Sequence, residues 1–239
     1  MSTVGKLIID IETVGENFSS FDEETKKNLT RFVEQDPEDE AVYQKGVEEV
    51  IAQLALSPLT AQIVSLGLYD YHKKKGLVLY QTEKEDVADI VEEEMTYRSM
   101  SEKKMLQVFW QMAREYSQFI TFNGRMFDIP FILLRSVANR VKPTKDLMRG
   151  RYLYQQSPSA QHIDLYDQFS FYGAIRKKGS MHLHTRAFDI QSSKEGGIDG
   201  GDVGGLFAAG KYLEIARYNG RDLVSTTELF DLWDQYLRF

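Results

Sequence analysis

Two acidic side chains stand two residues apart at the end of an apolar segment near the N-terminus. The segment reads Lys6-Leu7-Ile8-Ile9-Asp10-Ile11-Glu12-Thr13. Its apolar run is typical of a buried central strand, on which Asp10 and Glu12 point to the same side. Two neighbouring carboxylates repel each other unless a cation lies between them, and such hard oxygen ligands suit Mg²⁺ or Mn²⁺. The alternative is a strand that ends in solvent with two ordinary surface acids.

Another acid lies between an expected strand and an expected helix. Residues 119–122 are mostly apolar and predict a short strand, and a turn signal follows at Asn123. Residues 129–141 have helical apolar spacing, with Pro130 in the first turn, where its missing N–H is harmless. Asp128 therefore lies at a strand-to-helix junction. Its alternative role is to cap the helix.

A tyrosine and an aspartate near the C-terminus complete the set of candidate residues. Tyr218 and Asp222 are four residues apart and therefore share one face of a helix. An amphipathic pattern continues from there to the end of the sequence. Taken alone, the two residues could equally form a surface pair.

Together the three segments resemble the three exonuclease motifs of the DEDD superfamily, in its tyrosine-containing subclass (DEDDy). That superfamily includes the proofreading 3′–5′ exonuclease domains of family B DNA polymerases. The first motif, Asp-x-Glu, and the third, Tyr-x-x-x-Asp, match the acidic pair and the tyrosine–aspartate pair. The second, Asn-x-x-x-Phe/Tyr-Asp, matches Asn123, Phe127 and Asp128. Each motif alone is weak, but the ordered set is specific.

The resemblance runs from Leu7 to about Leu229, and it is to stand-alone predicted exonucleases related to the family B polymerase exonuclease domain. Residues 58–68 and the run from Gly197 to Ile215 share it. One departure is Asn219-Gly220 inside the third motif. Glycine there costs the helix about 1 kcal/mol relative to alanine, so we expect a softer tyrosine–aspartate geometry.

The resemblance implies a metal-dependent enzyme that hydrolyses phosphodiester bonds from the 3′ end of a nucleic acid. It implies two divalent cations, Mg²⁺ or Mn²⁺, held by Asp10, Glu12, Asp128 and Asp222, with Asp10 bridging both. Tyr218 would orient the attacking water, because an ordinary tyrosine pKa near 10 makes it a poor general base at neutral pH. The expected products are 5′-mononucleotides.

Substrate contacts are also implied by the resemblance. Thr13 and the adjacent backbone would hold the terminal 3′ hydroxyl, and Asn123 would contact the strand. Arg125 would contact phosphate. Phe127 would pack beneath the second motif, or a base would stack on a neighbouring aromatic side chain.

The net charge of −7 argues mildly against a general nucleic-acid-binding protein, which is usually basic. The charge is uneven, however: residues 15–60 hold eleven acids and four bases, whereas residues 135–151 hold six bases and one acid. We expect this basic run, which includes Arg149 and Arg151, to carry the substrate strand together with Arg176-Lys177-Lys178. The alternative is that these cations are ordinary solvated surface.

The 239 residues, 42% of them apolar, suffice for one sizeable core. We therefore expect a single exonuclease domain over residues 1–239, with no membrane-spanning segment and no secretory signal. The absence of cysteine excludes disulfides and thiolate metal sites, and it fits a cytoplasmic protein.

The expected fold class is α/β, with the mixed central sheet and flanking helices of the ribonuclease H-like fold, and it rests mainly on the resemblance. Residues 15–60 are an acidic, helical insertion between the first two strands, either a cap over the site or a surface for a protein partner. The predicted strands cover residues 6–12, 62–71, 76–81, 119–122 and 162–165. The predicted helices cover residues 102–116, 129–141, 166–172, 181–188, 203–209 and 212–236.

Three further features of the sequence suggest binding sites but have a plainer structural interpretation. Residues 191–205 are rich in glycine but lack a phosphate-binding fingerprint, so we interpret them as a mobile loop. His182 and His184 diverge on a helix, which does not favour a metal site. Asp164 and Asp167 could extend the acidic cluster, although helix capping is the preferred interpretation.

The predicted substrate is the 3′ end of single-stranded DNA. Two alternatives remain open: an exoribonuclease on the same scaffold, and a non-catalytic nucleic-acid-binding module that keeps the fold. The complete set of acids argues against the second. Metal-dependent thermal stabilisation with release of mononucleotides would distinguish them.

Overall fold

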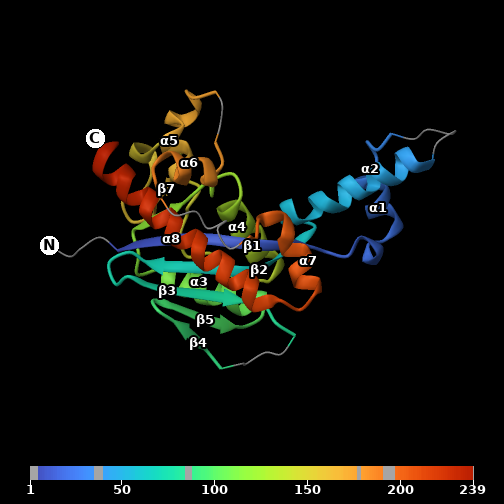
Figure 1. Ribbon diagram of the computed structural model, residues 1–239, viewed down its shortest axis with the longest axis horizontal. Helices are drawn as coiled ribbons and strands as arrows, with labels where there is room; N and C mark the ends of the chain where they lie inside the picture. The colour runs from blue at the N-terminus through green and yellow to red at the C-terminus, as the bar shows by residue number, and fades with distance from the viewer. Residues whose placement is uncertain (1–4, 35–39, 84–87, 177–178, 191–196, 239) are drawn as a thin grey trace.

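The computed structural model describes residues 5–34, 40–83, 88–176, 179–190 and 197–238. A seven-stranded mixed sheet in the order β4-β5-β3-β2-β1-β6-β7 lies at its centre (Figure 1). The central strand β1 pairs antiparallel with β2 and parallel with β6. The strands are β1 (Lys6–Gly15), β2 (Ala61–Asp70), β3 (Lys75–Tyr80), β4 (Ile90–Glu92), β5 (Met95–Ser99), β6 (Gln118–Thr121) and β7 (Gln161–Asp164).

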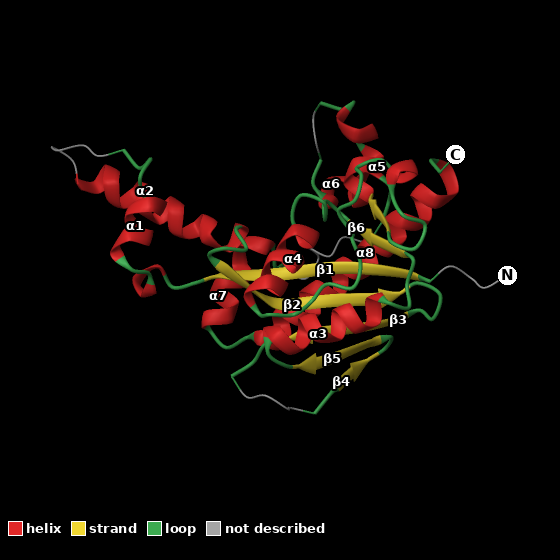
Figure 2. Ribbon diagram, turned by 180° about the vertical axis from the view of Figure 1, so that it is seen from behind, coloured by secondary structure: helices red, strands yellow, loops and turns green. Residues whose placement is uncertain are grey.

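Helices cover both faces of this sheet, as Figure 2 shows from behind. The α-helices are α1 (Glu23–Leu29), α2 (Glu40–Gln53), α3 (Glu102–Ala113), α4 (Asp128–Ala138), α5 (Leu165–Phe169), α6 (Met181–Ala187), α7 (Val203–Ala208) and α8 (Tyr212–Tyr236). Helices α3 and α4 pack on one face of the sheet, and the long α8 crosses the other. The observed architecture confirms the expected α/β class.

The alternation of side chains along β1 divides the core into two parts. Leu7, Ile9 and Ile11 are buried with the residues of α3 and α4, whereas Ile8 is buried with those of α8. Because side chains on a strand alternate between faces, Asp10 and Glu12 lie on the same face as Ile8. The sequence of β1 thus directs both acids toward α8.

All five predicted strands are present, and the predicted helix over residues 212–236 matches α8. Strands β4 and β5 were not predicted: β4 lies within residues 83–94, which are dominated by charge, and β5 is a five-residue segment directly after them. The predicted helix over residues 166–172 is too long. It ends at Phe169 because Phe171 and Tyr172 have φ angles of 49° and 56°, in the left-handed region.

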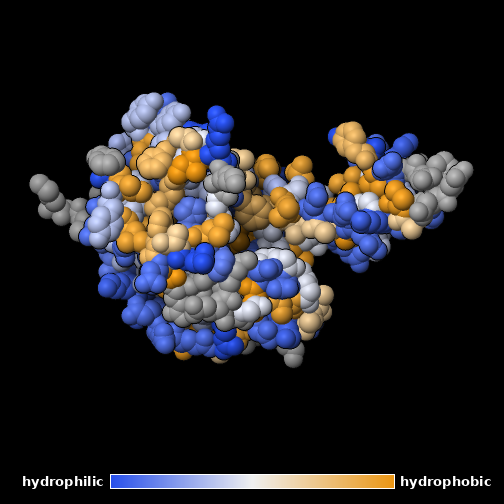
Figure 3. All heavy atoms as spheres, turned by 45° about the horizontal axis from the view of Figure 1, so that its top comes forward, coloured by the Kyte–Doolittle hydropathy of each residue, from blue (hydrophilic) through white to orange (hydrophobic). Residues whose placement is uncertain are grey.

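The insertion at residues 15–60 is helical, as predicted, in the part that the structure describes. Helices α1 and α2 form an arm that extends from the end of β1 away from the sheet in both views (Figures 1 and 2). The described part of the arm therefore does not cap the site. Exposed apolar side chains gather on the arm among hydrophilic ones (Figure 3), and Phe32 is 85% exposed.

Some sequence features fall outside the described residues. Lys177 and Lys178 of the second basic cluster do so, as do residues 191–196 of the glycine-rich segment. Within the described residues, none of the helices combines the length and the hydropathy that crossing a membrane would require.

Candidate active site

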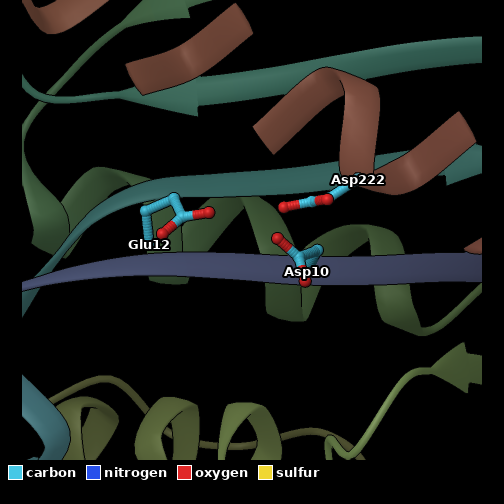
Figure 4. Close-up of side chains that lie close together, drawn as sticks. All are labelled: Asp10, Glu12 and Asp222. Atoms are coloured by element: carbon cyan, nitrogen blue, oxygen red, sulfur yellow. The ribbon is translucent and has the colours of Figure 1, made fainter. Parts of the chain in front are cut away.

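Three carboxylates meet between β1 and α8. Asp10 and Glu12 come from β1 and Asp222 comes from α8, and one oxygen of each lies within 4.8 Å of the others. Figure 4 shows Asp222 reaching from the helix toward the two side chains of the strand. Asp222 is only 4% exposed, and Glu12 is also buried. Two of the three predicted motifs are thus brought together by the packing of α8 on the sheet.

Two glycines allow α8 to approach the sheet this closely. Gly67 on β2 lies directly opposite Asp10, and a Cβ at that position would stand 2.1 Å from Oδ1 of Asn219. Gly220 on α8 faces β5, where a Cβ would stand 3.1 Å from the hydroxyl of Tyr97. The glycine of the third motif therefore also lies at a tight contact between α8 and β5, where an added Cβ would require Tyr97 to shift slightly.

The second motif delivers Asp128 from the first residue of α4. Strand β6 pairs with β1 as far as Ile8, and farther along β1 the N–H of Ile11 donates to Oδ1 of Asp128 at 3.1 Å. The carboxylate thus contacts β1 between Asp10 and Glu12. It is buried, but among the described residues it is not one of the three whose oxygens lie within 4.8 Å.

The electrostatics of the site are unfavourable to four charged acids. Burial, followed by the charges of the neighbouring acids, raises the pKa of Asp10 and Glu12 well above the ordinary values. Burial also raises the pKa of Asp128 to about 7, and Asp164 and Asp222 contribute to the rise, whereas hydrogen bonds from the backbone lower it. Carboxylates in this state gain stability from a cation, because it offsets both their burial and their mutual repulsion.

Tyr218 stands one turn before Asp222 on α8 and is buried beside the carboxylates. Burial is the main cause of a rise in its pKa far above the ordinary value, and the charges of Asp222, Glu12 and Asp10 add to it. The guanidinium of Arg221 lies 5.8 Å from the centre of the tyrosine ring. The hydroxyl therefore keeps its proton at neutral pH.

Asn219 is a residue of the site that the motifs did not identify. Its side chain is 0% exposed, and Nδ2 donates to Oδ2 of Asp10 at 2.7 Å. The signal available in the sequence was the pair Asn219-Gly220 itself, a polar residue followed by a poor helix former inside a helix. The buried Asn219 side chain is tolerated because Gly67, on a distant strand, leaves space for it.

The turn of the second motif is held by Asp164 at the end of β7. The carboxylate of Asp164 accepts the backbone N–H groups of Asn123 at 2.8 Å and Arg125 at 2.9 Å. It also accepts the N–H of Tyr166, so it caps α5, as the preferred interpretation held. Asn123 adopts φ of 64°, a left-handed conformation that asparagine tolerates better than most residues.

Two further residues to which the resemblance assigns substrate contacts, Thr13 and Phe127, make contacts within the protein. The hydroxyl of Thr13 donates to the carbonyl of Ala55 at 2.7 Å, so it holds the base of the arm. Phe127 packs on the core, with its ring centre 5.3 Å from that of Phe131. Phe127 is thus partly buried against the core at the start of α4.

Most of the basic run is engaged in structural contacts. Arg135 makes a two-pronged ion pair with buried Glu102, and Lys145 donates to the carbonyls of Tyr116 and Ser159. Arg125 donates to the carbonyl of Met148 at 2.9 Å, and its Nη1 has no hydrogen-bond partner among the described residues. The basic run is therefore not a continuous row of free cations.

The two arginines predicted to bind substrate differ from each other. Arg151 pairs with Asp167 at 2.6 Å, which offsets its charge. Arg149 makes no ion pair within the described part of the chain. His184 packs its ring against Phe122 and Phe169, and neither His182 nor His184 belongs to a metal-ligating group among the described residues.

Comparison with known proteins places this site in a family context. Residues 69–238, which include the second and third motifs, match the family described as a predicted 3′–5′ exonuclease related to the exonuclease domain of PolB. DNA polymerase 1 of Sulfolobus acidocaldarius is 38% identical over 79 residues. DNA polymerase 1 of Sulfurisphaera ohwakuensis is 36% identical over 81 residues. Each alignment covers 32% of this chain and 9% of the relative, so the chain spans a small part of those proteins.

The fold is shared with a solved structure, the family B DNA polymerase from the hyperthermophilic archaeon Pyrobaculum calidifontis. The two superpose with a TM-score of 0.57 at 16% sequence identity. The match covers 96% of this chain and 24% of the polymerase chain. This similarity, with the mixed sheet and its flanking helices, confirms the ribonuclease H-like fold.

Proposed function

The chain belongs to the family of predicted 3′–5′ exonucleases related to the exonuclease domain of PolB, and from this premise we propose its substrate, metals and catalytic residues. The substrate is the 3′ end of single-stranded DNA, and the products are 5′-mononucleotides and a shortened strand. The observation that carries this proposal is the meeting of three carboxylates from β1 and α8, two of them buried, with Asp128 beside them.

The donor set fits hard divalent cations. Among the described residues, the metal-ligating group at this site consists of carboxylates alone, and burial and mutual repulsion raise the pKa values of Asp10, Glu12 and Asp128. Asp10, Glu12, Asp128 and Asp222 would hold two Mg²⁺ or Mn²⁺ ions. Such a pair, when bound, offsets the charge of the phosphodiester and aligns the attacking water with the leaving 3′ oxygen.

The other side chains orient the reactants. Tyr218, which keeps its proton, hydrogen-bonds the attacking water and sets its direction instead of removing its proton. Asn123 lies in the half-buried turn after β6, from which its side chain contacts the strand. The backbone around Thr13 receives the terminal nucleotide, and Arg125, in the turn held by Asp164, contacts a phosphate. Phe127, which packs against the core, anchors the second motif.

The rest of the chain supports the carboxylate site and the path of the substrate strand. We propose that residues 1–239 form a single exonuclease domain, in which residues 15–60 are an insertion and a candidate surface for a protein partner. Arg149 and Arg151 extend the path of the strand beyond the carboxylates. An acidic surface offers little to hold a second strand, so single strands are preferred over blunt duplexes.

The test is digestion of matched DNA and RNA oligonucleotides with Mg²⁺, with Mn²⁺ and with EDTA. We expect cleavage with either cation and none with EDTA. Asp10→Ala, Asp128→Ala and Asp222→Ala should each lower the rate by several orders of magnitude, because each removes a metal ligand. Glu214→Gln is the matched control, since Glu214 is a partly exposed acid on the same helix as Asp222 and pairs with Lys211.

Three results would contradict the proposal. Full activity in Asp10→Ala would remove the carboxylates from the mechanism. Faster digestion of RNA than of DNA would make the enzyme an exoribonuclease on the same scaffold. Binding of oligonucleotides without release of mononucleotides under any metal condition would leave a non-catalytic binding module.

A further inference from the structure

We propose that Asn219 is a positioning residue, which fixes the orientation of Asp10 for metal binding. The inference rests on the proposed function, since it concerns the same carboxylates. Asn219 occupies a variable position of the third motif, between Tyr218 and Asp222. It acts through Asp10 and needs no contact with the substrate.

The contact between the two side chains is short and shielded from water. Nδ2 of Asn219 lies 2.7 Å from Oδ2 of Asp10, and Asn219 is fully buried. An amide donor to a carboxylate is stronger and more directional than a bond between neutral groups. Of the two orientations of the amide, only this one is attractive, because the other would turn its oxygen toward the carboxylate.

Asn219 is also poorly explained as a stabilising core residue. Its Oδ1 atom is buried and has no hydrogen-bond partner among the described residues. A buried acceptor without a partner costs about 1–3 kcal/mol, which an apolar side chain would not. A residue that carries this cost while donating to a predicted metal ligand is better explained by the site than by packing.

The sheet is adapted to this side chain. Gly67 is the residue of β2 that lies directly opposite Asp10, and a Cβ there would stand 2.1 Å from Oδ1 of Asn219 and 2.8 Å from Cδ1 of Leu223. Any other residue at position 67 would displace Asn219 from Asp10. Strand β2 and helix α8, distant in sequence, thus form one cradle for the amide.

The chemical consequence concerns orientation. A free aspartate can rotate its carboxylate, and each orientation presents its oxygens differently to a cation. With Oδ2 held by the amide, the carboxylate plane is fixed before a cation arrives. Hydrogen-bonded partners of this kind typically change metal affinity 10- to 100-fold when removed.

The experiment is a titration of the full chain with Mn²⁺, in which free Mn²⁺ is measured by its electron paramagnetic resonance signal. We expect Asn219→Ala to raise the dissociation constant of Mn²⁺ about 10- to 100-fold. Thr226→Val is the matched control. Thr226 is equally buried, lies two turns later on α8 and contacts Met181 instead of the carboxylates. The Thr226→Val protein should bind Mn²⁺ with the dissociation constant of the parent.

The outcomes separate this inference from the proposed function. If the parent binds Mn²⁺ and Asp10→Ala does not, but Asn219→Ala stays within twofold of the parent, Asn219 is a packing residue and the inference is wrong. If Asp10→Ala binds as tightly as the parent, the metal site itself is wrong, and both proposals fall.

Gly67→Ala provides a second route to the same result. Its methyl group should push Asn219 away from Asp10 and raise the Mn²⁺ dissociation constant as Asn219→Ala does. The double variant should bind no more weakly than either single one, because both changes remove the same contact. Additive losses, or parent-like affinity in Gly67→Ala, would contradict the role of Asn219.

Discussion

At the scale of single residues, the site combines groups that would not otherwise be buried together. Asp10, Glu12, Asp128 and Asp222 all lie in or beside the core, and the pKa values of the first three are raised. Charged acids at these positions destabilise the fold unless a cation compensates them. The same residues therefore couple metal binding to stability.

This coupling predicts how stability depends on pH. A carboxyl group whose pKa rises from 3.8 to about 7 on folding, as for Asp128, binds more protons in the folded state than in the unfolded state. The stability from its protonation is complete below pH 4 and is lost as the pH rises through 7. Cations must displace these protons, so the rise in Tm caused by Mn²⁺ should be larger at pH 8 than at pH 5.

Thermal unfolding at the two pH values, with and without Mn²⁺, checks this prediction. Glu214→Gln should behave as the parent does, whereas Asp128→Asn should show a smaller dependence on pH. An equal Tm shift at pH 5 and pH 8 would mean that the buried acids do not exchange protons for the cation.

A variant at Tyr218 tests the orientation of the attacking water separately from the binding of metal. Tyr218→Phe keeps the ring beside Arg221 and removes only the hydroxyl. We expect kcat to fall by about 10²- to 10⁴-fold, the usual contribution of such a group, with little change in the Mg²⁺ concentration required. Steady-state kinetics over a range of Mg²⁺ checks this. An unchanged kcat would reduce Tyr218 to a packing residue.

The residues that carry the proposed chemistry could be predicted from the sequence because their spacing is distinctive. Asp10, Glu12, Tyr218 and Asp222 share a face of a strand or helix in any fold that keeps those elements. Asn219 could not be assigned in this way, since its role depends on Gly67, about 150 positions earlier in the sequence. The supporting role of Asp164 likewise depends on the pairing of β6 with β7.

At the scale of elements, α8 decides whether the site forms. It crosses the face of the sheet and carries Tyr218, Asn219 and Asp222 to β1. Buried Glu102 helps to hold the opposite face, because it accepts the N–H of Ile63 on β2 and pairs with Arg135 on α4. The prediction that Gly220 softens the third motif considered the helix alone and did not include its neighbour, Tyr97.

The close approach of α8 to β5 can be tested at Gly220. Alanine should gain about 1 kcal/mol of helix propensity, but its Cβ would stand 3.1 Å from the hydroxyl of Tyr97. In a Tyr97→Phe background the nearest ring atom is at 3.6 Å, an ordinary contact. Gly220→Ala should therefore be more stabilising by about 1 kcal/mol in that background than in the parent.

Denaturant unfolding of the parent, Gly220→Ala, Tyr97→Phe and the double variant measures the coupling free energy between positions 97 and 220. The same effect of Gly220→Ala in both backgrounds would show that α8 does not press on Tyr97. Strand β5, which supplies this contact, has only five residues and lies between β3 and the three-residue edge strand β4, and segments this short give weak strand patterns in the sequence.

At the scale of the whole molecule, an acidic protein must hold a polyanion. The fold class could be predicted because the three motifs fix the order of the elements around them. The basic path could not be judged from the sequence, since the ion pairs of Arg135 and Arg151 depend on tertiary contacts with Glu102 and Asp167. Arg149, which makes no such pair within the described residues, is the better candidate for a phosphate contact.

The salt dependence of KM tests this difference. Each lost phosphate contact on a single strand should reduce the slope of log affinity against log salt by about 0.7. We expect about that change for Arg149→Gln and a smaller one for Arg151→Gln, whose charge Asp167 offsets. KM should rise more than kcat falls, because phosphate contacts position the substrate.

Arg98→Gln is the control for this series, because Arg98 pairs with Asp89 at the other edge of the sheet. If the double variant of Arg149 and Arg151 keeps the slope and KM of the parent, these residues are solvated surface. Binding would then depend on the carboxylate site, Asn123 and nearby aromatic side chains.

The most direct test of the central claim follows the direction of digestion on a single-stranded DNA oligonucleotide labelled at its 5′ end, in the presence of Mn²⁺. The account predicts a ladder of labelled strands that shorten stepwise from the 3′ end, with 5′-mononucleotides as the other product. A 3′-phosphate should block the reaction, and Asp222→Ala should abolish it. Early release of the label as a mononucleotide, or cleavage of a closed circular single strand, would contradict a 3′–5′ exonuclease.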